Sequence, residues 1–362
     1  MTVRVRDDLA ALEGYHSPQV DVAVRLNTNE SPYPPPEAWR QAFLDEVKAI
    51  TFNRYPDRQA SVLRRALGDL HGVAPEQVFA ANGSNEVLQA LCLAYGGHAR
   101  SVVVFEPTYP LHSHIARITG SEVVAGGRRD DFSLDPDDVR RVLVRADPAI
   151  TFLCSPNNPT GTVDPSATTA AVVAAAPGLV VVDEAYGQFA PRSAISQVSD
   201  GGGLVVVRTF SKAWAMAGLR LGYCVAPAEV VTALESVTLP YHLDTATQAA
   251  GRLALRFRSE MEARVALLVA ERDRLTRALS ALPVDTWPSG ANFVLFRPRV
   301  RAGAEVWKAL VERSVLVRDC AAWPGLDGCL RVTVGTPHED DAFLAALTEV
   351  LGPSGPLRGV AA

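Results

Sequence analysis

Four short apolar runs recur through the first two thirds of the chain, and each run ends in polar residues. Alanine-rich stretches of helical character separate them. Uninterrupted apolar runs of this length are typical of strands buried on both faces, and helical crossovers favour parallel pairing. The pattern therefore predicts an α/β fold in which a mainly parallel sheet lies between helices. The four runs occupy residues 101–105, 150–154, 179–182 and 204–208.

A proline-rich segment precedes the predicted sheet. Four of the five residues 32–36 are proline, which forbids a helix and favours an extended path. Composition alone favours a rigid linker here. Amphipathic periodicity then predicts helices at 36–50, at about 60–70 and at 87–95, with a short strand at 78–81.

The last third of the chain has the pattern of a smaller α+β domain. One long helix is expected from about 247 to 281, strands at 291–296, 315–318 and 329–334, and a final helix at 339–351. Only the last ten residues have the composition of a disordered tail. We therefore expect an N-terminal arm (1–36) that belongs to the small domain and covers the active site, a large domain (37–242) and a small C-terminal domain (243–362).

Composition narrows the classes of function. A chain of 362 residues exceeds the usual single-core limit, and its net charge of −5, without a basic block, disfavours a nucleic-acid partner. The five scattered cysteines form no close pair of the kind that zinc sites use, so no metal is expected and the thiols are predicted to be reduced in the cytoplasm. The longest apolar stretch, 170–182, is too short for a membrane span, and we find no signal peptide.

A lysine just beyond the fourth apolar run suggests the chemistry. Lys212 follows Thr209 and Ser211, and Asp183 ends the third run. Ligands of open α/β sheets bind where the carboxyl ends of the strands meet, so these residues are expected at one rim. A lysine amine that forms a Schiff base and a carboxylate facing a pyridine nitrogen are what pyridoxal 5'-phosphate requires.

Other strand-end residues supply the remaining roles of a pyridoxal phosphate site. Asn158 and Tyr186 could bond the phenolic oxygen, and Tyr109 could stack on the ring. Taken singly, each residue has a simpler explanation, and Ser84 or Asn85 could merely cap a helix. Their common position at strand ends favours the cofactor. Five residues are predicted to surround its phosphate: Ser84, Asn85, Thr209, Ser211 and Arg220.

Three motifs closely resemble those of the fold-type-I aminotransferases, and further motifs are similar to the histidinol-phosphate aminotransferase family within them. The resemblance covers nearly the whole chain. It implies that Lys212 binds the cofactor covalently, that Asp183 faces the pyridine nitrogen and that Tyr109 stacks on the ring. The first three motifs are Asn157-Asn158-Pro159-Thr160-Gly161, Val182-Asp183-Glu184-Ala185-Tyr186 and Thr209-Phe210-Ser211-Lys212-Ala213 through Gly218-Leu219-Arg220-Leu221-Gly222-Tyr223. The further motifs are Leu26-Asn27-Thr28-Asn29-Glu30-Ser31-Pro32, Arg54-Tyr55-Pro56-Asp57, Gly83-Ser84-Asn85-Glu86, Pro107-Thr108-Tyr109 and Leu330-Arg331-Val332-Thr333-Val334-Gly335-Thr336.

The resemblance also implies a homodimer, in which Tyr55 reaches the cofactor phosphate of the partner subunit. The arm, with Tyr15 and Asn29, would close over the substrate, which replaces the linker interpretation. Arg318 and Arg331 match the family's substrate-anion arginines. We expect reversible amino transfer from histidinol phosphate to 2-oxoglutarate, giving imidazole acetol phosphate and glutamate.

Alternatives remain at this stage. Within the fold, an aromatic amino-acid aminotransferase or a pathway-specific relative has the same cofactor motifs. A non-catalytic pyridoxal-binding regulator would need a DNA-binding module, for which the short arm before Asn27 leaves no room. A nicotinamide dehydrogenase would need a Gly-x-Gly-x-x-Gly turn after a strand, whereas Gly201-Gly202-Gly203 precedes one.

Overall fold

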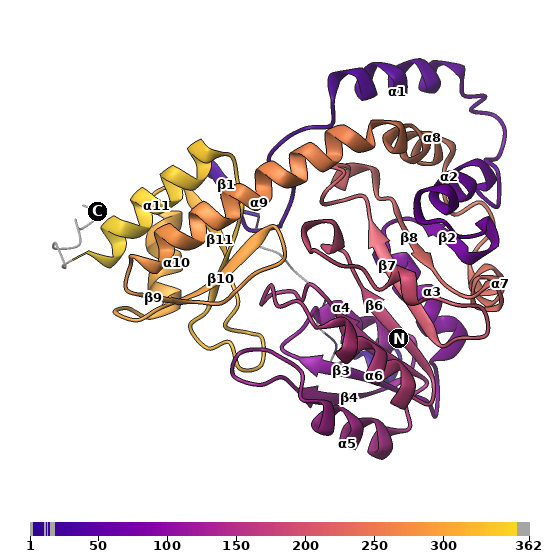
Figure 1. Ribbon diagram of the computed structural model, residues 1–362, viewed down its shortest axis with the longest axis horizontal. Helices are drawn as coiled ribbons and strands as arrows, with labels where there is room; N and C mark the ends of the chain where they lie inside the picture. The colour runs from indigo at the N-terminus through magenta and orange to yellow at the C-terminus, as the bar shows by residue number, and fades with distance from the viewer. Residues whose placement is uncertain (1–2, 11, 13, 15–18, 353–362) are drawn as a thin grey trace.

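Two β-sheets organise the molecule. The computed structural model describes residues 3–10, 12, 14 and 19–352 (Figure 1). A seven-stranded sheet has the order β2-β8-β7-β6-β5-β3-β4, and a five-stranded sheet has the order β1-β11-β12-β10-β9. Helices flank the larger sheet, so the predicted α/β fold with a mainly parallel sheet is confirmed.

The large sheet contains the four apolar strands that the sequence predicts. The five strands β3 to β7 pair in parallel, whereas β8 is antiparallel to both β7 and β2. The sequence pattern did not predict β4, in which no residue is fully buried, or β8, which begins inside one of the motifs that carry the resemblance. The strands are β2 (Val78–Ala81), β3 (Ser101–Glu106), β4 (Glu122–Gly127), β5 (Ile150–Cys154), β6 (Leu179–Asp183), β7 (Leu204–Thr209) and β8 (Gly222–Val225).

The central strands of this sheet are buried on both faces. Val180 and Val182 of β6 belong to one hydrophobic cluster, and Val181 between them belongs to a second cluster on the opposite face. Each buried valine contributes about 1.5–3 kcal/mol through removal of apolar surface from water. The flanking helices are α2 (Ser61–His71), α3 (Ser84–Tyr95), α4 (Pro110–Ile118), α5 (Pro136–Ala146), α6 (Ser166–Ala175) and α7 (Ala228–Val237).

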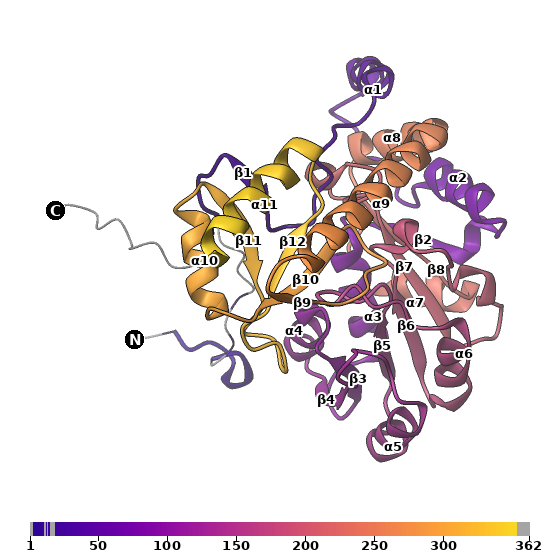
Figure 2. The same ribbon diagram turned by 60° about the vertical axis from the view of Figure 1, so that its left-hand side comes forward.

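The small sheet combines the two ends of the chain. Its first strand, β1 (Val24–Leu26), pairs in parallel with β11, and Figure 2 shows this strand beside the C-terminal elements. The proposed boundaries at residues 36 and 242 stay predictions. The other elements are β9 (Val284–Thr286), β10 (Phe293–Pro298), β11 (Val315–Asp319), β12 (Leu330–Thr333), α10 (Gly303–Val311) and α11 (Pro337–Leu351).

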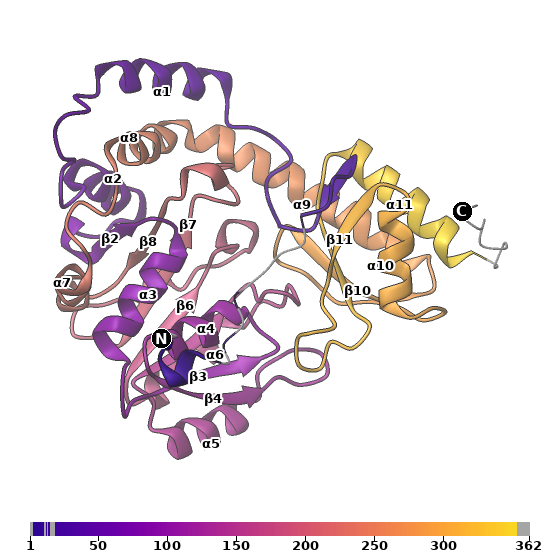
Figure 3. The same cartoon turned by 180° about the vertical axis from the view of Figure 1, so that it is seen from behind.

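The helix predicted at about 247–281 is two helices. A 3-10 turn, η6 (Leu255–Phe257), separates α8 (Thr245–Ala254) from α9 (Arg258–Ser280), because the backbone of Phe257 leaves the helical conformation at φ −108° and ψ 35°. No proline or glycine marks this break, so helical periodicity continues through it. Seen from behind, α9 runs from the large sheet to the small sheet (Figure 3).

The remaining helix, α1 (Glu37–Ala49), packs on α8, and its Trp39 Nε1 donates a hydrogen bond to Ala250 O at 3.2 Å.

All five cysteines are free and buried, as predicted. No helix in the described ranges is long and apolar enough to cross a membrane. The short 3-10 helices are η1 (Asp7–Leu9), η2 (Pro75–Gln77), η3 (Gly187–Phe189), η4 (Ile195–Gln197) and η5 (Ala217–Leu219).

Candidate active site

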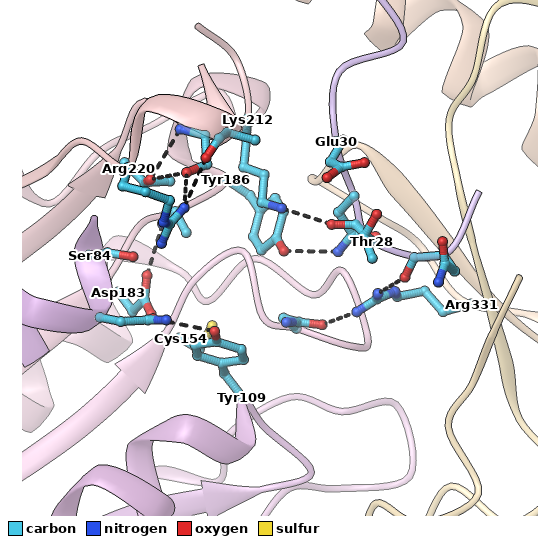
Figure 4. Close-up of a pocket in the computed structure, with 18 of the residues that line it drawn as sticks. Thr28, Glu30, Ser84, Tyr109, Cys154, Asp183, Tyr186, Lys212, Arg220 and Arg331 are labelled. Carbon is cyan, nitrogen blue, oxygen red and sulfur yellow. Dashed lines mark hydrogen bonds between the residues drawn. The ribbon is translucent and has the colours of Figure 1, made fainter. Parts of the chain in front are cut away.

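A cavity of about 360 Å³ lies where the carboxyl ends of β5, β6 and β7 meet the N-terminal arm and β12 (Figure 4). The structure brings most of the predicted site residues together around it. Those lining the cavity are Asn29, Ser84, Asn85, Tyr109, Asn158, Asp183, Tyr186, Thr209, Ser211, Lys212, Arg220 and Arg331.

Lys212 lies on the loop after β7 and extends its amine into the cavity. Its Nζ donates a hydrogen bond to Thr28 O of the arm at 2.9 Å. Burial, followed by the positive charge of Arg331, lowers the pKa of Lys212 to about 8. Burial is the larger of these two causes. The amine can therefore exchange protons near neutral pH.

Asp183 ends β6 and is 2% exposed. Its Oδ1 accepts a hydrogen bond from the Ala185 N–H at 2.9 Å, and its Oδ2 lies 3.0 Å from His112 Nε2. His112 is fully buried and stacks on Phe152 with ring centroids 4.7 Å apart. The two bonds fix the carboxylate in one orientation, as a partner for a cationic ring nitrogen requires.

His112 is a residue that the sequence argument missed. It lies three residues after Tyr109, in the first turn of α4, and the two rings meet edge to face with centroids 5.4 Å apart. Its Nδ1 is buried, and none of the described residues forms a hydrogen bond with it. A neutral ring with its proton on Nε2 leaves only a lone pair unpartnered and donates to Asp183.

The start of α3 forms one wall of an anion-binding cup. Gly83 is the N-cap residue with φ +80°, and no side chain caps the helix, so the alternative that Ser84 or Asn85 is the cap is wrong. A Cβ on Gly83 would lie 2.7 Å from Arg220 Nη2, and one on Gly222 would lie 2.2 Å from Ser84 N. Both glycines thus allow the guanidinium and the helix terminus to converge, an arrangement that suits a phosphate.

Hydroxyl groups complete the cup. Thr209 Oγ1 donates to Ser211 Oγ at 3.1 Å, and Arg220 Nη1 donates to the same Ser211 oxygen at 3.3 Å. On the facing side, Tyr109 OH donates to Asn85 Oδ1 at 3.4 Å. The predicted phosphate residues therefore gather at this end of the cavity, where Ser211 joins Thr209 and Arg220.

Arg331 on β12 marks the other end of the cavity. Its two terminal nitrogens donate to Asn158 Oδ1 and, at 2.9 Å, to Asn27 O. Its Nε is buried and has no hydrogen-bond partner in the described part of the chain. Its guanidinium also lies 5.0 Å from the centre of the Phe293 ring. A buried guanidinium with donor capacity to spare is suited to bind an anionic ligand.

The arm is fastened to both sheets by Asn29. This residue has φ +56°, a conformation that asparagine tolerates, and its N–H donates to Thr333 Oγ1 at 3.0 Å. Its Nδ2 donates to Tyr186 OH at 2.8 Å, and burial raises the pKa of that phenol. Asn292 Nδ2 donates to Asn29 O at 3.2 Å. The arm therefore forms a fixed wall of the cavity.

Two predicted site residues lie away from the cavity. Arg318 is directly opposite Arg331 in the β11–β12 pairing and lies 5.2 Å from the Trp323 ring centre, but it does not line the cavity. Tyr55 is 80% exposed and stacks on Tyr241 with ring centroids 4.4 Å apart, so it does not reach this protomer's own cavity. Tyr15 lies outside the described residues.

The residues present fit pyridoxal 5'-phosphate. An anion cup, a carboxylate held in one orientation, an aromatic ring at Tyr109 and a lysine amine of lowered pKa occur around one cavity. Each feature matches one part of that molecule: its phosphate, its pyridine nitrogen, its ring face and its aldehyde.

Comparisons with known proteins agree in the family that they indicate. Residues 21–347 match the family described as aminotransferase class I and II. The chain is 47% identical to a histidinol-phosphate aminotransferase of Frankia casuarinae, over 96% of this chain and 90% of the relative. It is 46% identical to one of Thermobifida fusca, over 96% and 95% of the two chains.

A solved structure supports the fold independently. The crystal structure of histidinol-phosphate aminotransferase from Sinorhizobium meliloti in complex with pyridoxal 5'-phosphate superposes with a TM-score of 0.88. The match covers 96% of this chain and 97% of that chain at 24% identity, which bears on the fold alone.

Proposed function

The chain belongs to the class I and II aminotransferases, and on this premise we propose that it is a histidinol-phosphate transaminase. It transfers the amino group of L-histidinol phosphate to 2-oxoglutarate, giving imidazole acetol phosphate and glutamate, a step of histidine biosynthesis. The observation that carries the proposal is the cavity that places Lys212 between the Asp183 carboxylate and the Arg331 guanidinium. Such an arrangement suits an amine substrate with an anionic group.

We assign pyridoxal 5'-phosphate as the cofactor. When bound, it supplies an electron sink that stabilises negative charge on the substrate Cα. Asp183, oriented by His112, would pair with the pyridine nitrogen and keep it protonated. Ser84, Asn85, Thr209, Ser211 and Arg220 would bind the phosphate, Tyr109 would stack on the ring, and Asn158 and Tyr186 would contact the phenolic oxygen.

Lys212 performs the proton transfers in this assignment. Because its pKa is about 8, the amine is an effective base and its ammonium an effective acid near neutral pH. The amine donates a hydrogen bond to Thr28 O of the arm at 2.9 Å, which holds it beside the arm. Lys212 would therefore remove the proton from the substrate Cα and deliver it to C4′ of the cofactor.

Arg331 would hold the substrate's anionic group. Asn158 and the Asn27 carbonyl fix its terminal nitrogens, while its Nε keeps unused donor capacity. A phosphate carries more charge and more acceptor oxygens than a carboxylate. Arg331 would therefore bind histidinol phosphate more tightly than glutamate and still accept glutamate. We keep Arg318, Tyr15 and Asn29 as substrate-binding residues in this proposal.

The proposal includes a homodimer. Tyr55 lies in an exposed apolar group with Phe52, Leu239 and Tyr241, whose exposed fractions range from 42% to 80%. Exposed aromatic side chains in one region are typical of an interface. Tyr55 of each protomer would contact the cofactor phosphate of the other. Sedimentation of wild-type protein and of a Tyr241→Asp variant tests this assignment, and a monomeric wild type would contradict it.

Paired half-reactions test the function. The pyridoxal form would be mixed separately with histidinol phosphate and with phenylalanine, and the change in cofactor absorbance followed. We expect the kcat/KM for histidinol phosphate to exceed that for phenylalanine by at least about 100-fold, because only the former carries a phosphate for Arg331. A preference for phenylalanine would instead identify an aromatic amino-acid aminotransferase.

Borohydride labelling tests the cofactor assignment. The protein would be incubated with pyridoxal phosphate, reduced with borohydride and digested. We expect the label on the peptide that contains Lys212 and none in a Lys212→Met variant. Protein that stays colourless with pyridoxal phosphate and unlabelled after reduction would exclude the enzyme hypothesis.

A further inference from the structure

The charges lining the cavity have one carboxylate more than the mechanism uses. Lys212, Arg220 and Arg331 are the cationic side chains of the lining, and Asp183 and Glu30 are the anionic ones. Arg220 belongs to the phosphate cup, Arg331 to the substrate anion and Asp183 to the cofactor ring. Glu30 has no role in this assignment.

Glu30 also lacks a protein partner. Among the described residues, none forms a hydrogen bond or ion pair with its carboxylate, and the side chain is exposed. Other polar residues of the same arm segment are used, since Thr28 O accepts from Lys212 and Asn29 bonds Tyr186 and Thr333. The arm thus holds the backbone of Glu30 in place while leaving its carboxylate free for a ligand.

The position of Glu30 is close to the reacting amine. Figure 4 shows Glu30 on the arm beside Lys212, separate from Arg331. Its negative charge raises the pKa of Lys212 against the larger lowering effects of burial and Arg331. The carboxylate is therefore near enough to act on a substrate whose Cα lies at Lys212.

We propose that Glu30 accepts a hydrogen bond from the imidazole N–H of histidinol phosphate and so selects an imidazole over a phenyl ring. This inference rests on the proposed function. Two groups branch from the substrate Cα besides its amine and hydrogen. With the phosphate arm at Arg331, the ring arm is the one left for Glu30. An imidazole offers an N–H to a carboxylate, whereas a phenyl ring offers none and forms no hydrogen bond with Glu30.

The same carboxylate disfavours the second substrate. Glutamate would place its α-carboxylate at Arg331 and its γ-carboxylate in the region of the ring, where Glu30 repels it. Because Glu30 is exposed, it can turn into solvent, so the repulsion weakens glutamate binding without preventing it. Loss of the negative charge should therefore act in opposite directions on the two half-reactions.

The test uses two substrates that differ only in the ring, histidinol phosphate and phenylalaninol phosphate. Single-turnover half-reactions of the holoenzyme would be measured for wild type, Glu30→Gln and Glu30→Leu, with Glu37→Gln as the matched control. Glu37 is an exposed glutamate of α1 outside the cavity and pairs with Arg40. Cofactor absorbance and thermal melting would confirm that each variant is folded and loaded.

We expect Glu30→Leu to lower kcat/KM for histidinol phosphate by roughly 10- to 100-fold, mainly through KM, and that for phenylalaninol phosphate by less than about threefold. Glu30→Gln should fall between wild type and Glu30→Leu, because its amide oxygen still accepts a hydrogen bond. Glutamate should react faster with both variants. Equal losses of kcat/KM with the two substrates would indicate that Glu30 acts on the substrate amine, and would overturn the inference. No loss of kcat/KM with either substrate would overturn it as well.

The two proposals fail in distinguishable ways. If wild type prefers phenylalaninol phosphate, the proposed function itself is wrong. If wild type prefers histidinol phosphate and both Glu30 variants keep that preference, only the role of Glu30 is wrong. Should the leucine variant not fold, the nearly isosteric Glu30→Gln still decides through its rate ratio and its glutamate reaction.

Discussion

The two ends of the cavity are built in different ways. The end that we assign to the cofactor is formed by the ends of neighbouring strands of the large sheet and by the start of α3. Asp183 is the last residue of β6, and Lys212 lies on the loop after β7. The end that we assign to the substrate joins the arm to β12, and Asn29 and Thr333, which bond there, are 304 residues apart. The residues of the first end are brought together by the order of the strands, and those of the second end by contacts between distant parts of the chain.

This difference separates two questions about function. Strand ends of a buried sheet have little freedom, so the residues there report the chemistry that the fold performs. The arm and β12 can change their side chains without altering the large sheet. Substitutions at the two ends should therefore separate general loss of transamination from loss of one substrate.

Lys212→Ala should have the largest effect. Removal of the amine deletes the proton carrier, and we expect both half-reactions to slow by about 10⁴-fold, the upper range for one acid–base group. Stopped-flow absorbance would measure each rate, with Lys308→Ala on the exposed face of α10 as control. Retention of more than about 1% of the rate would contradict the assignment.

Asp183→Asn should reduce the rate with both substrates by about 10²- to 10³-fold, the usual cost of losing one preorganised charge. The amide cannot keep a pyridine nitrogen protonated, although its oxygen can still accept the hydrogen bond from the Ala185 N–H. Half-reaction rates with histidinol phosphate and with glutamate would be compared with those of Asp45→Asn, a surface variant of α1. A loss restricted to one substrate would place Asp183 at the wrong end of the cavity.

Arg331→Lys should act on the substrate end. A lysine cannot reproduce the bonds to Asn158 and Asn27 and still bind an anion, so we expect kcat/KM for histidinol phosphate to fall roughly 10- to 100-fold. The cofactor spectrum should not change. Arg297→Lys, on the outer side of β10, is the control. Loss of cofactor in Arg331→Lys would remove the distinction between the two ends.

The pH dependence of stability should show the smallest effect. The pKa of Lys212 is about 8 when folded and 10.5 in its ordinary state, so the unfolded chain binds more protons between these values. Stability therefore rises with pH across that window. Relative to Lys212→Met, cofactor-free wild type should gain roughly 2 kcal/mol in unfolding free energy from pH 7.5 to 9.5. Urea unfolding at both pH values measures it, and an unchanged difference would exclude a buried, neutralised amine.

Apolar patterning was sufficient to predict the central strands of the large sheet and the residues at its rim. Continuous apolar strands such as β5 and β6 are long enough to recognise, and the polar residues after them are then placed by topology. Periodicity failed where the physical signal is weak: β4 is half exposed, β8 is short, and the turn between α8 and α9 has no breaking residue.

The rest of the site could not be derived from local pattern. Nothing near His112 in the sequence shows that it lies 3.0 Å from Asp183, 71 residues away. The same holds for Glu30, whose significance depends on which neighbours already have partners. Arg318 and Arg331 lie opposite each other in the pairing of β11 with β12, yet only Arg331 lines the cavity.

The pairing of Asn29 with Thr333 also has a consequence for the order of synthesis. A ribosome delivers the arm long before β12, so the bond between Asn29 and Thr333 cannot form until more than 300 residues have followed Asn29. A nascent chain that has finished the large sheet holds the Lys212 rim but no Arg331. Transaminase activity is thereby withheld from incomplete chains, and its appearance marks the end of translation and folding.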